Sequence, residues 1–107
     1  MLECGVSEVR AVPVQSASDT PYRAWFKGQS SAMVAARSRL IQHPSYYRWD
    51  ESGAPFGAAI DACLDEALAL ASELGLRTYR DPEGYYGYIE MGTGPEQLAI
   101  LCHVDVV

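Results

Sequence analysis

The residues best suited to metal binding or catalysis in this sequence are His103 and Asp105. They are separated by one residue and follow the apolar run 98–102. In an extended chain, side chains two residues apart point to the same side, so the imidazole and the carboxylate are expected side by side where a buried strand ends. Such a pair is costly to bury without a partner. A metal ion is one such partner, because neutral imidazole is a zinc ligand and a neighbouring carboxylate fixes its tautomer.

A purely structural alternative fits the same spacing, since a histidine and an aspartate at a strand end can hydrogen-bond to each other and need no metal. The sequence has no second cluster of histidine or cysteine, no HExxH or GxSxG motif and no glycine-rich phosphate loop. Spacing alone therefore leaves both interpretations of the pair open.

The element expected to carry this pair is a strand over residues 98–104. A continuous apolar run without alternation is typical of a strand covered on both faces. Upstream, residues 76–80 and 85–91 favour strands, and the sequence Asp-Pro-Glu-Gly between them favours a turn. These segments predict a hairpin and one inner strand.

Two segments show the spacing of apolar residues that is typical of helices. The clearer one spans residues 58–74 and is followed by Gly75, which favours the left-handed conformation that ends many helices. The other spans residues 24–42 and is expected to end before Pro44. His43, at that end, is expected to interact with the helix dipole rather than with a metal. The predicted fold class is α/β, with two helices packed on a small mixed sheet of about three strands.

The remaining segments offer weaker indications. Residues 1–21 keep no periodicity and predict an irregular tail. Residues 43–57 form an aromatic-rich loop that is expected to fold back on the core. Its aromatic side chains either fill the rim of the core or line a ligand pocket, and they are Tyr46, Tyr47 and Trp49. Three carboxylates on the 58–74 helix are expected to form a solvated face rather than a catalytic cluster, and they are Asp61, Asp65 and Glu66.

Composition narrows the class of protein and its partners. A chain of 107 residues with 49% apolar side chains is one globular domain or part of one. Eight Lys and Arg against fourteen Asp and Glu give a net charge of −6, which argues against nucleic acid and anionic membranes as partners. Cys4, Cys63 and Cys102 are not closely paired and are expected to be reduced core thiols of a cytoplasmic protein. No apolar run approaches the length of a membrane span.

Several segments together carry a resemblance to a known family: residues 40–45, 54–57, 74–78 and 81–88, and Ile-Leu-Cys-His-Val-Asp-Val-Val at 100–107. They resemble zinc-dependent exopeptidases and amidohydrolases that include aminoacylase, acetylornithine deacetylase, succinyl-diaminopimelate desuccinylase and carnosinase, and above all the dipeptidase V branch. The resemblance covers residues 22–107. It implies that this region is the amino-terminal part of a metallopeptidase catalytic domain.

The resemblance implies that His103 is a ligand of Zn²⁺ and that Asp105 is the active-site carboxylate that orients it. It also implies that the intact enzyme hydrolyses dipeptides or related amides. The other metal ligands and the general base of such enzymes lie downstream of this motif, so the chain is expected to be inactive alone. The alternative is a small non-catalytic interaction module or a truncated remnant of such a hydrolase. An uncovered apolar sheet would then allow self-association.

Overall fold

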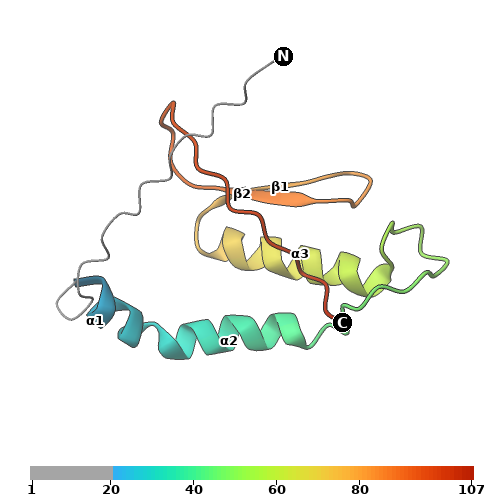
Figure 1. The fold of residues 1–107 in the computed structure, drawn as a ribbon, viewed down its shortest axis with the longest axis horizontal. Helices are drawn as coiled ribbons and strands as arrows, with labels where there is room; N and C mark the ends of the chain where they lie inside the picture. The colour runs from blue at the N-terminus through green and yellow to red at the C-terminus, as the bar shows by residue number, and fades with distance from the viewer. Residues whose placement is uncertain (1–20) are drawn as a thin grey trace, which may run out of the picture. The chain divides into compact units, whose positions relative to one another are not determined.

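The computed structural model describes residues 21–107, and the chain divides into two units, Met1–Ser30 and Ser31–Val107. The described elements are, in order, α1 (Pro21–Gly28), α2 (Ser30–Ile41), α3 (Ala58–Glu73), β1 (Arg77–Arg80) and β2 (Gly87–Glu90) (Figure 1). These helices and strands confirm the predicted α/β class. The irregular tail predicted over residues 1–21 lies outside the described residues, except for Pro21, which begins α1.

The helix predicted over residues 24–42 forms as two helices, because Gln29 separates α1 from α2. Gly28 precedes this break and has a low intrinsic helix propensity. The Gln29 amide donates to the carbonyl oxygens at the end of α1, so that helix closes in a turn. Helix α2 ends at Ile41, before Pro44, as predicted.

Helix α3 matches the prediction most closely. It buries one stripe of side chains, spaced three to five residues apart, and these are Ile60, Cys63, Leu68 and Ala71. At its C-terminal end the Gly75 amide donates to the Ser72 carbonyl oxygen at 2.9 Å, and the Leu76 amide donates to that of Ala71 at 3.1 Å. This is the Schellman arrangement, and the positive φ of 79° at Gly75 meets its requirement for a left-handed residue.

The predicted hairpin also forms. Strands β1 and β2 are antiparallel, with Thr78 opposite Ile89 and Tyr79 opposite Tyr88. The hairpin lies beside α3 (Figure 1). The two are so close that a side-chain carbon added at Gly87 would lie 3.0 Å from a methyl carbon of Leu68. Glycine at this position therefore permits the strand to approach the helix.

The packing of the second helix differs from the prediction. Within residues 31–107, α3 is the helix that packs on the strands, whereas α2 is joined to α3 by ion pairs. The Arg39 guanidinium on α2 donates to Glu66 and to both carboxylate oxygens of Glu73, the latter at 2.7 and 2.9 Å. Among residues 21–107 the sheet likewise has two antiparallel strands rather than about three in a mixed arrangement.

The prediction of an inner strand over residues 98–104 is wrong. This segment has no regular secondary structure, and its side chains are exposed except for that of Val104, which is half-buried. The two described strands pair with each other and do not pair with it, so it has no ladder to join. For the same reason Cys102, expected as a core thiol, is exposed, whereas Cys63 is buried.

The buried apolar core of the described residues is small and comes from α3. Large apolar side chains of the other elements remain exposed. In residues 21–107, no helix is both long and apolar enough to cross a bilayer.

Candidate functional site

The two residues singled out by sequence lie together in the structure. Nδ1 of His103 is 3.0 Å from the Asp105 carbonyl oxygen and 3.2 Å from its carboxylate oxygen Oδ1. The His103 side chain is 81% exposed, so the ring faces solvent. Its second ring nitrogen, Nε2, has no hydrogen-bond partner among residues 21–107. The pair is therefore oriented through one nitrogen and open at the other.

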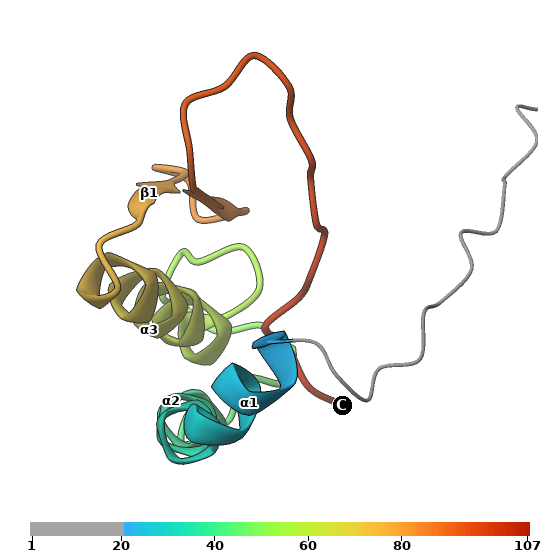
Figure 2. The same ribbon diagram turned by 90° about the vertical axis from the view of Figure 1, so that its left-hand side faces the viewer.

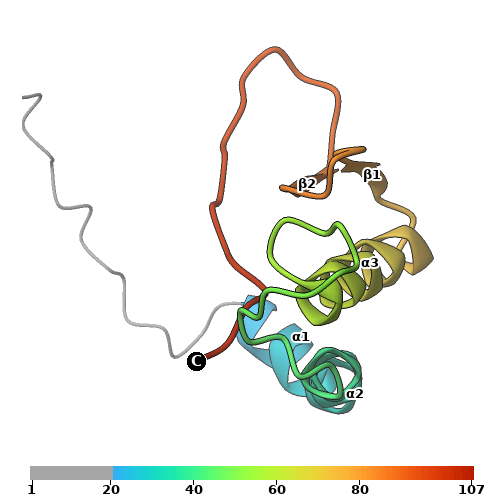
Figure 3. The ribbon, with the colours of Figure 1, turned by 90° about the vertical axis from the view of Figure 1, so that its right-hand side faces the viewer.

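The segment that carries this pair is fixed to the rest of its unit by Ser45. The buried Ser45 hydroxyl donates to the Val104 carbonyl oxygen at 2.8 Å, and the Val106 amide donates to the Ser45 carbonyl oxygen at 2.8 Å. Tyr46 and Val106 form an isolated parallel bridge. Figures 2 and 3 show the chain leaving β2 in a wide arc and returning to the segment that follows α2. His103 and Asp105 lie on either side of the anchored residue Val104.

Ser45 was missed by the sequence analysis, which treated its loop as an aromatic segment. Its sequence context offers one signal: it follows Pro44 directly, in a stretch expected to fold back on the core. A serine there gives no indication of which distant carbonyl it will meet, since residues 45 and 104 are far apart in sequence.

The described residues do not make a complete metal site. Residues 21–107 contain no group of three or more His, Cys, Asp and Glu side chains placed to hold an ion. A catalytic zinc usually has three protein ligands and one open position, and His103 with Asp105 supplies at most two. The other described histidine, His43, has its Nε2 3.9 Å from a carboxylate oxygen of Glu66 and belongs to the α2–α3 contact.

A hollow of about 510 Å³ lies beside the first turn of α3. Two of the three aromatic residues considered for a pocket, Tyr46 and Trp49, line it, and Tyr47 does not. The hollow is also lined by Arg48 and Asp50. The hollow is open to solvent, since Tyr46 is 47% and Trp49 80% exposed, and no buried charged group points into it.

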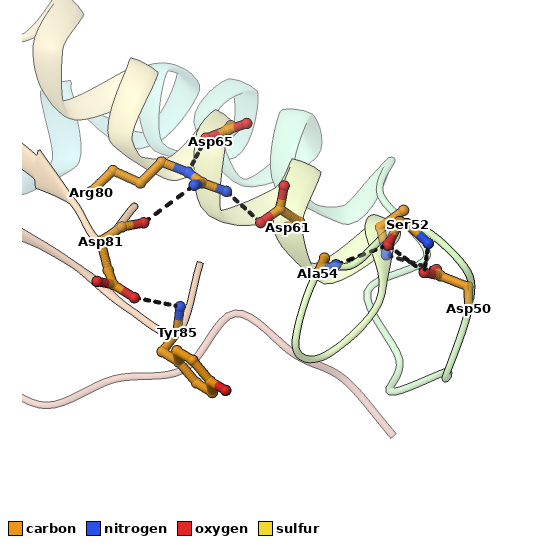
Figure 4. A network of polar contacts seen from close by, with 9 residues as sticks. Asp50, Ser52, Ala54, Asp61, Asp65, Arg80, Asp81 and Tyr85 are labelled. Atoms are coloured by element: carbon orange, nitrogen blue, oxygen red, sulfur yellow. Dashed lines mark hydrogen bonds and ion pairs between the residues drawn. The ribbon is translucent and has the colours of Figure 1, made fainter. Parts of the chain in front are cut away.

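Asp50 organises the loop that forms this hollow (Figure 4). One carboxylate oxygen accepts hydrogen bonds from the Ser52 hydroxyl and amide, and the other accepts one from the Ala58 amide at 2.8 Å. The Ser52 hydroxyl and then these amides hold the pKa of Asp50 below its ordinary value. Asp50 thus caps α3 from a distance, since Gly57 at the N-cap has no side chain to do so.

The carboxylates of α3 are ion-paired rather than simply solvated. Arg80 of β1 pairs with Asp61 and, at 2.6 Å, with Asp65 (Figure 4). Glu66 pairs with Arg39. Each carboxylate thus lies beside an arginine of another element, in ion pairs that are partly exposed to solvent.

No family model matches the chain, and no solved structure matches it. Over 55 residues the chain is 42% identical to the protein named putative dipeptidase YtjP of Bacillus subtilis strain 168. That match covers 51% of this chain but 12% of the length of the relative. The chain is therefore related in part to a dipeptidase-like protein and spans a small fraction of it.

Proposed function

We propose that this chain is the amino-terminal segment of a cytoplasmic, zinc-dependent dipeptidase-like hydrolase that acts on dipeptides or related amides. In this proposal His103 is one zinc ligand and Asp105 is the carboxylate that orients it. The partial identity to a protein named as a dipeptidase supports the hydrolase class. The observation that carries the assignment of residues is the His103–Asp105 contact.

The geometry of that contact suits a metal ligand. Asp105 contacts Nδ1 of His103 and so fixes the orientation of the ring. This leaves Nε2 as the nitrogen that would bind the metal. The ring is exposed, so an ion and further ligands can approach it. Because residues 21–107 supply too few ligands, we expect that this chain does not hydrolyse dipeptides by itself.

The test is a zinc titration of the full chain, followed by NMR of the histidine rings and by an assay with a panel of dipeptides. We expect weak binding that shifts the His103 ring signals, and no hydrolysis. The variant His103→Gln should lose this binding. Asp105→Asn should weaken it by about 10- to 100-fold, because a carboxylate that orients a ligand histidine contributes that much to metal affinity.

His43→Gln is the matched control, since His43 faces Glu66 and not the proposed site. It should leave zinc binding unchanged. Zinc shifts that appear at His43 and not at His103 would contradict the assignment of the ligand. Tight stoichiometric zinc with turnover by the isolated chain would contradict the proposal that most of the site is missing.

A second candidate function is a non-catalytic interaction module, and one observation favours it. The segment around Leu98, Ile100 and Leu101 exposes a row of apolar side chains on an unpaired backbone. Binding by this segment needs no metal and no general base. Under this alternative, His103→Gln changes zinc binding but not association.

A further inference from the structure

We propose that two copies of this chain associate through residues 98–104, which become an antiparallel pair of strands related by a two-fold axis at Leu101. This inference goes beyond the proposed function and does not depend on it. It rests on three features of one segment: exposed apolar side chains, an unpaired backbone, and a charge pattern that suits one alignment of two copies.

The side chains of the segment are more exposed than their chemistry favours. Leu98 is 89%, Ile100 80% and Leu101 96% exposed. Apolar side chains of paired strands pack against each other across the pair, so an exposed apolar segment of this kind favours association.

The backbone of residues 98–103 also lacks backbone partners. Between residues 93 and 103, no backbone group is hydrogen-bonded to another backbone group of the described chain. An extended segment with free donors and acceptors is a template for another strand. Residues 98–103 therefore have exposed side chains and no backbone–backbone hydrogen bonds within residues 21–107, whereas Val104 is held by Ser45.

The Ser45 contacts determine which edge of the segment is free. The Val104 carbonyl and the Val106 amide both point to Ser45. In a strand, the amide and carbonyl groups of one residue point to one edge, and those of the next residue point to the other edge. Since residues 104 and 106 point to Ser45, a strand over 98–104 would point the amides and carbonyls of residues 99, 101 and 103 to the opposite, free edge. Two copies that meet at this free edge must place odd-numbered residues opposite odd-numbered residues.

The apolar run and the flanking charges then select one register. Centring the pair on Leu101 places Leu98 opposite Val104 and Ile100 opposite Cys102 of the second copy. It also places Glu96 opposite Val106 and Asp105 opposite Gln97, so no two carboxylates face each other. A parallel in-register pair would instead set Glu96 against Glu96 and Asp105 against Asp105, which is unfavourable. A closed two-fold dimer is the expected assembly.

Cysteine cross-linking tests the register directly. In a Cys4→Ser background, Ile100→Cys places a thiol opposite Cys102 of the second copy, and mild oxidation should give a covalent dimer on a non-reducing gel. Ala99→Cys is the matched control, because position 99 lies opposite His103 and points to the other face of the pair. We expect no covalent dimer from it. Equal cross-linking of the two variants would overturn the proposed register.

Sedimentation of the full chain over a range of concentrations tests the association itself. We expect a monomer–dimer equilibrium that Leu101→Lys abolishes, because it sets two ammonium groups against each other on the two-fold axis. Met91→Lys changes an equally exposed apolar residue outside the segment and should leave the dimer intact. A wild-type chain that stays monomeric at all concentrations, or that forms open-ended oligomers, would overturn the proposal.

Discussion

The hydroxyl of Ser45 donates a 2.8 Å hydrogen bond to the carbonyl oxygen of Val104, which lies 59 residues further along the chain. Ser45 is 2% exposed, so this bond is shielded from water. Its acceptor lies between His103 and Asp105. A serine in a loop thus positions the candidate site, although it touches neither of the two site residues.

Removal of this hydroxyl should loosen the segment. We expect Ser45→Ala to lower the free energy of unfolding by about 1 kcal/mol, because one shielded hydrogen bond is lost. We also expect faster hydrogen exchange at the Val106 amide, which donates to the Ser45 carbonyl oxygen. Ser72→Ala, on the exposed side of α3, should change neither quantity. Unchanged exchange at Val106 in Ser45→Ala would show that the hydroxyl does not hold the segment.

Gly57 should tolerate no side chain. It has φ 97° and ψ 155°, a conformation that is essentially restricted to glycine, and an added Cβ would collide with the Arg48 carbonyl oxygen. We expect Gly57→Ala to lower the free energy of unfolding by about 1–3 kcal/mol in urea unfolding followed by circular dichroism. Gly53 also has a positive φ, but an added Cβ would meet open space there. Gly53→Ala should therefore lower the free energy of unfolding by less than Gly57→Ala. Equal losses would contradict the steric argument.

The stability of the α2–α3 contact should depend on pH. The Arg39 side chain donates two hydrogen bonds to Glu73 and holds the pKa of that carboxyl below its ordinary value of 4.5. A carboxyl with a lowered folded-state pKa stabilises the protein fully above its unfolded pKa, and this contribution is lost as the pH falls through the folded value. We therefore expect acidification below 4.5 to lower the free energy of unfolding.

Glu73→Gln should lose less stability on that acidification than the wild type, when urea unfolding is compared at neutral and acidic pH. Glu51→Gln is a suitable control, because the Glu51 carboxylate has no ion-pair partner within residues 21–107. An equal acid response of the wild type and Glu73→Gln would show that this ion pair does not contribute.

The two described cysteines should differ in reactivity. Cys63 is buried in α3 and Cys102 is exposed, and a thiol reagent needs access to sulfur. In a Cys4→Ser background at low protein concentration, we expect one thiol to react fast and the second to react only after denaturation. Adding Cys102→Ser should remove the fast reaction. Two fast thiols in the folded protein would contradict the burial of Cys63.

The local elements were predictable from sequence, and their long-range partners were not. The apolar stripe of α3, Gly75 after it and the Asp-Pro-Glu-Gly turn each specify structure within a few residues. The predicted helix 24–42 is interrupted at Gln29, directly after Gly28, which has a low helix propensity. The error over residues 98–104 has a different cause, since a continuous apolar run forms an inner strand only where strands pair with its edges and other layers cover its faces.

The same limit applies to the candidate site. The spacing of His103 and Asp105 predicted their proximity, because residues two apart in an extended segment share a side. Their anchoring by Ser45 could not be predicted, because one hydroxyl can meet any carbonyl that the fold brings near. The pairing of Arg80 with Asp61 likewise depends on how the hairpin lies on α3.

The hydrogen bond between Ser45 and Val104 also closes residues 45–104 into a loop without a covalent bond. Helix α3 and the hairpin are part of this loop. The entropy released when such a loop opens grows only with the logarithm of its length, so few hydrogen bonds suffice to keep it shut. Helix α3 and the hairpin retain their own contacts after opening. Gentle warming should therefore release residues 98–107 as one irregular segment well before the helix unfolds.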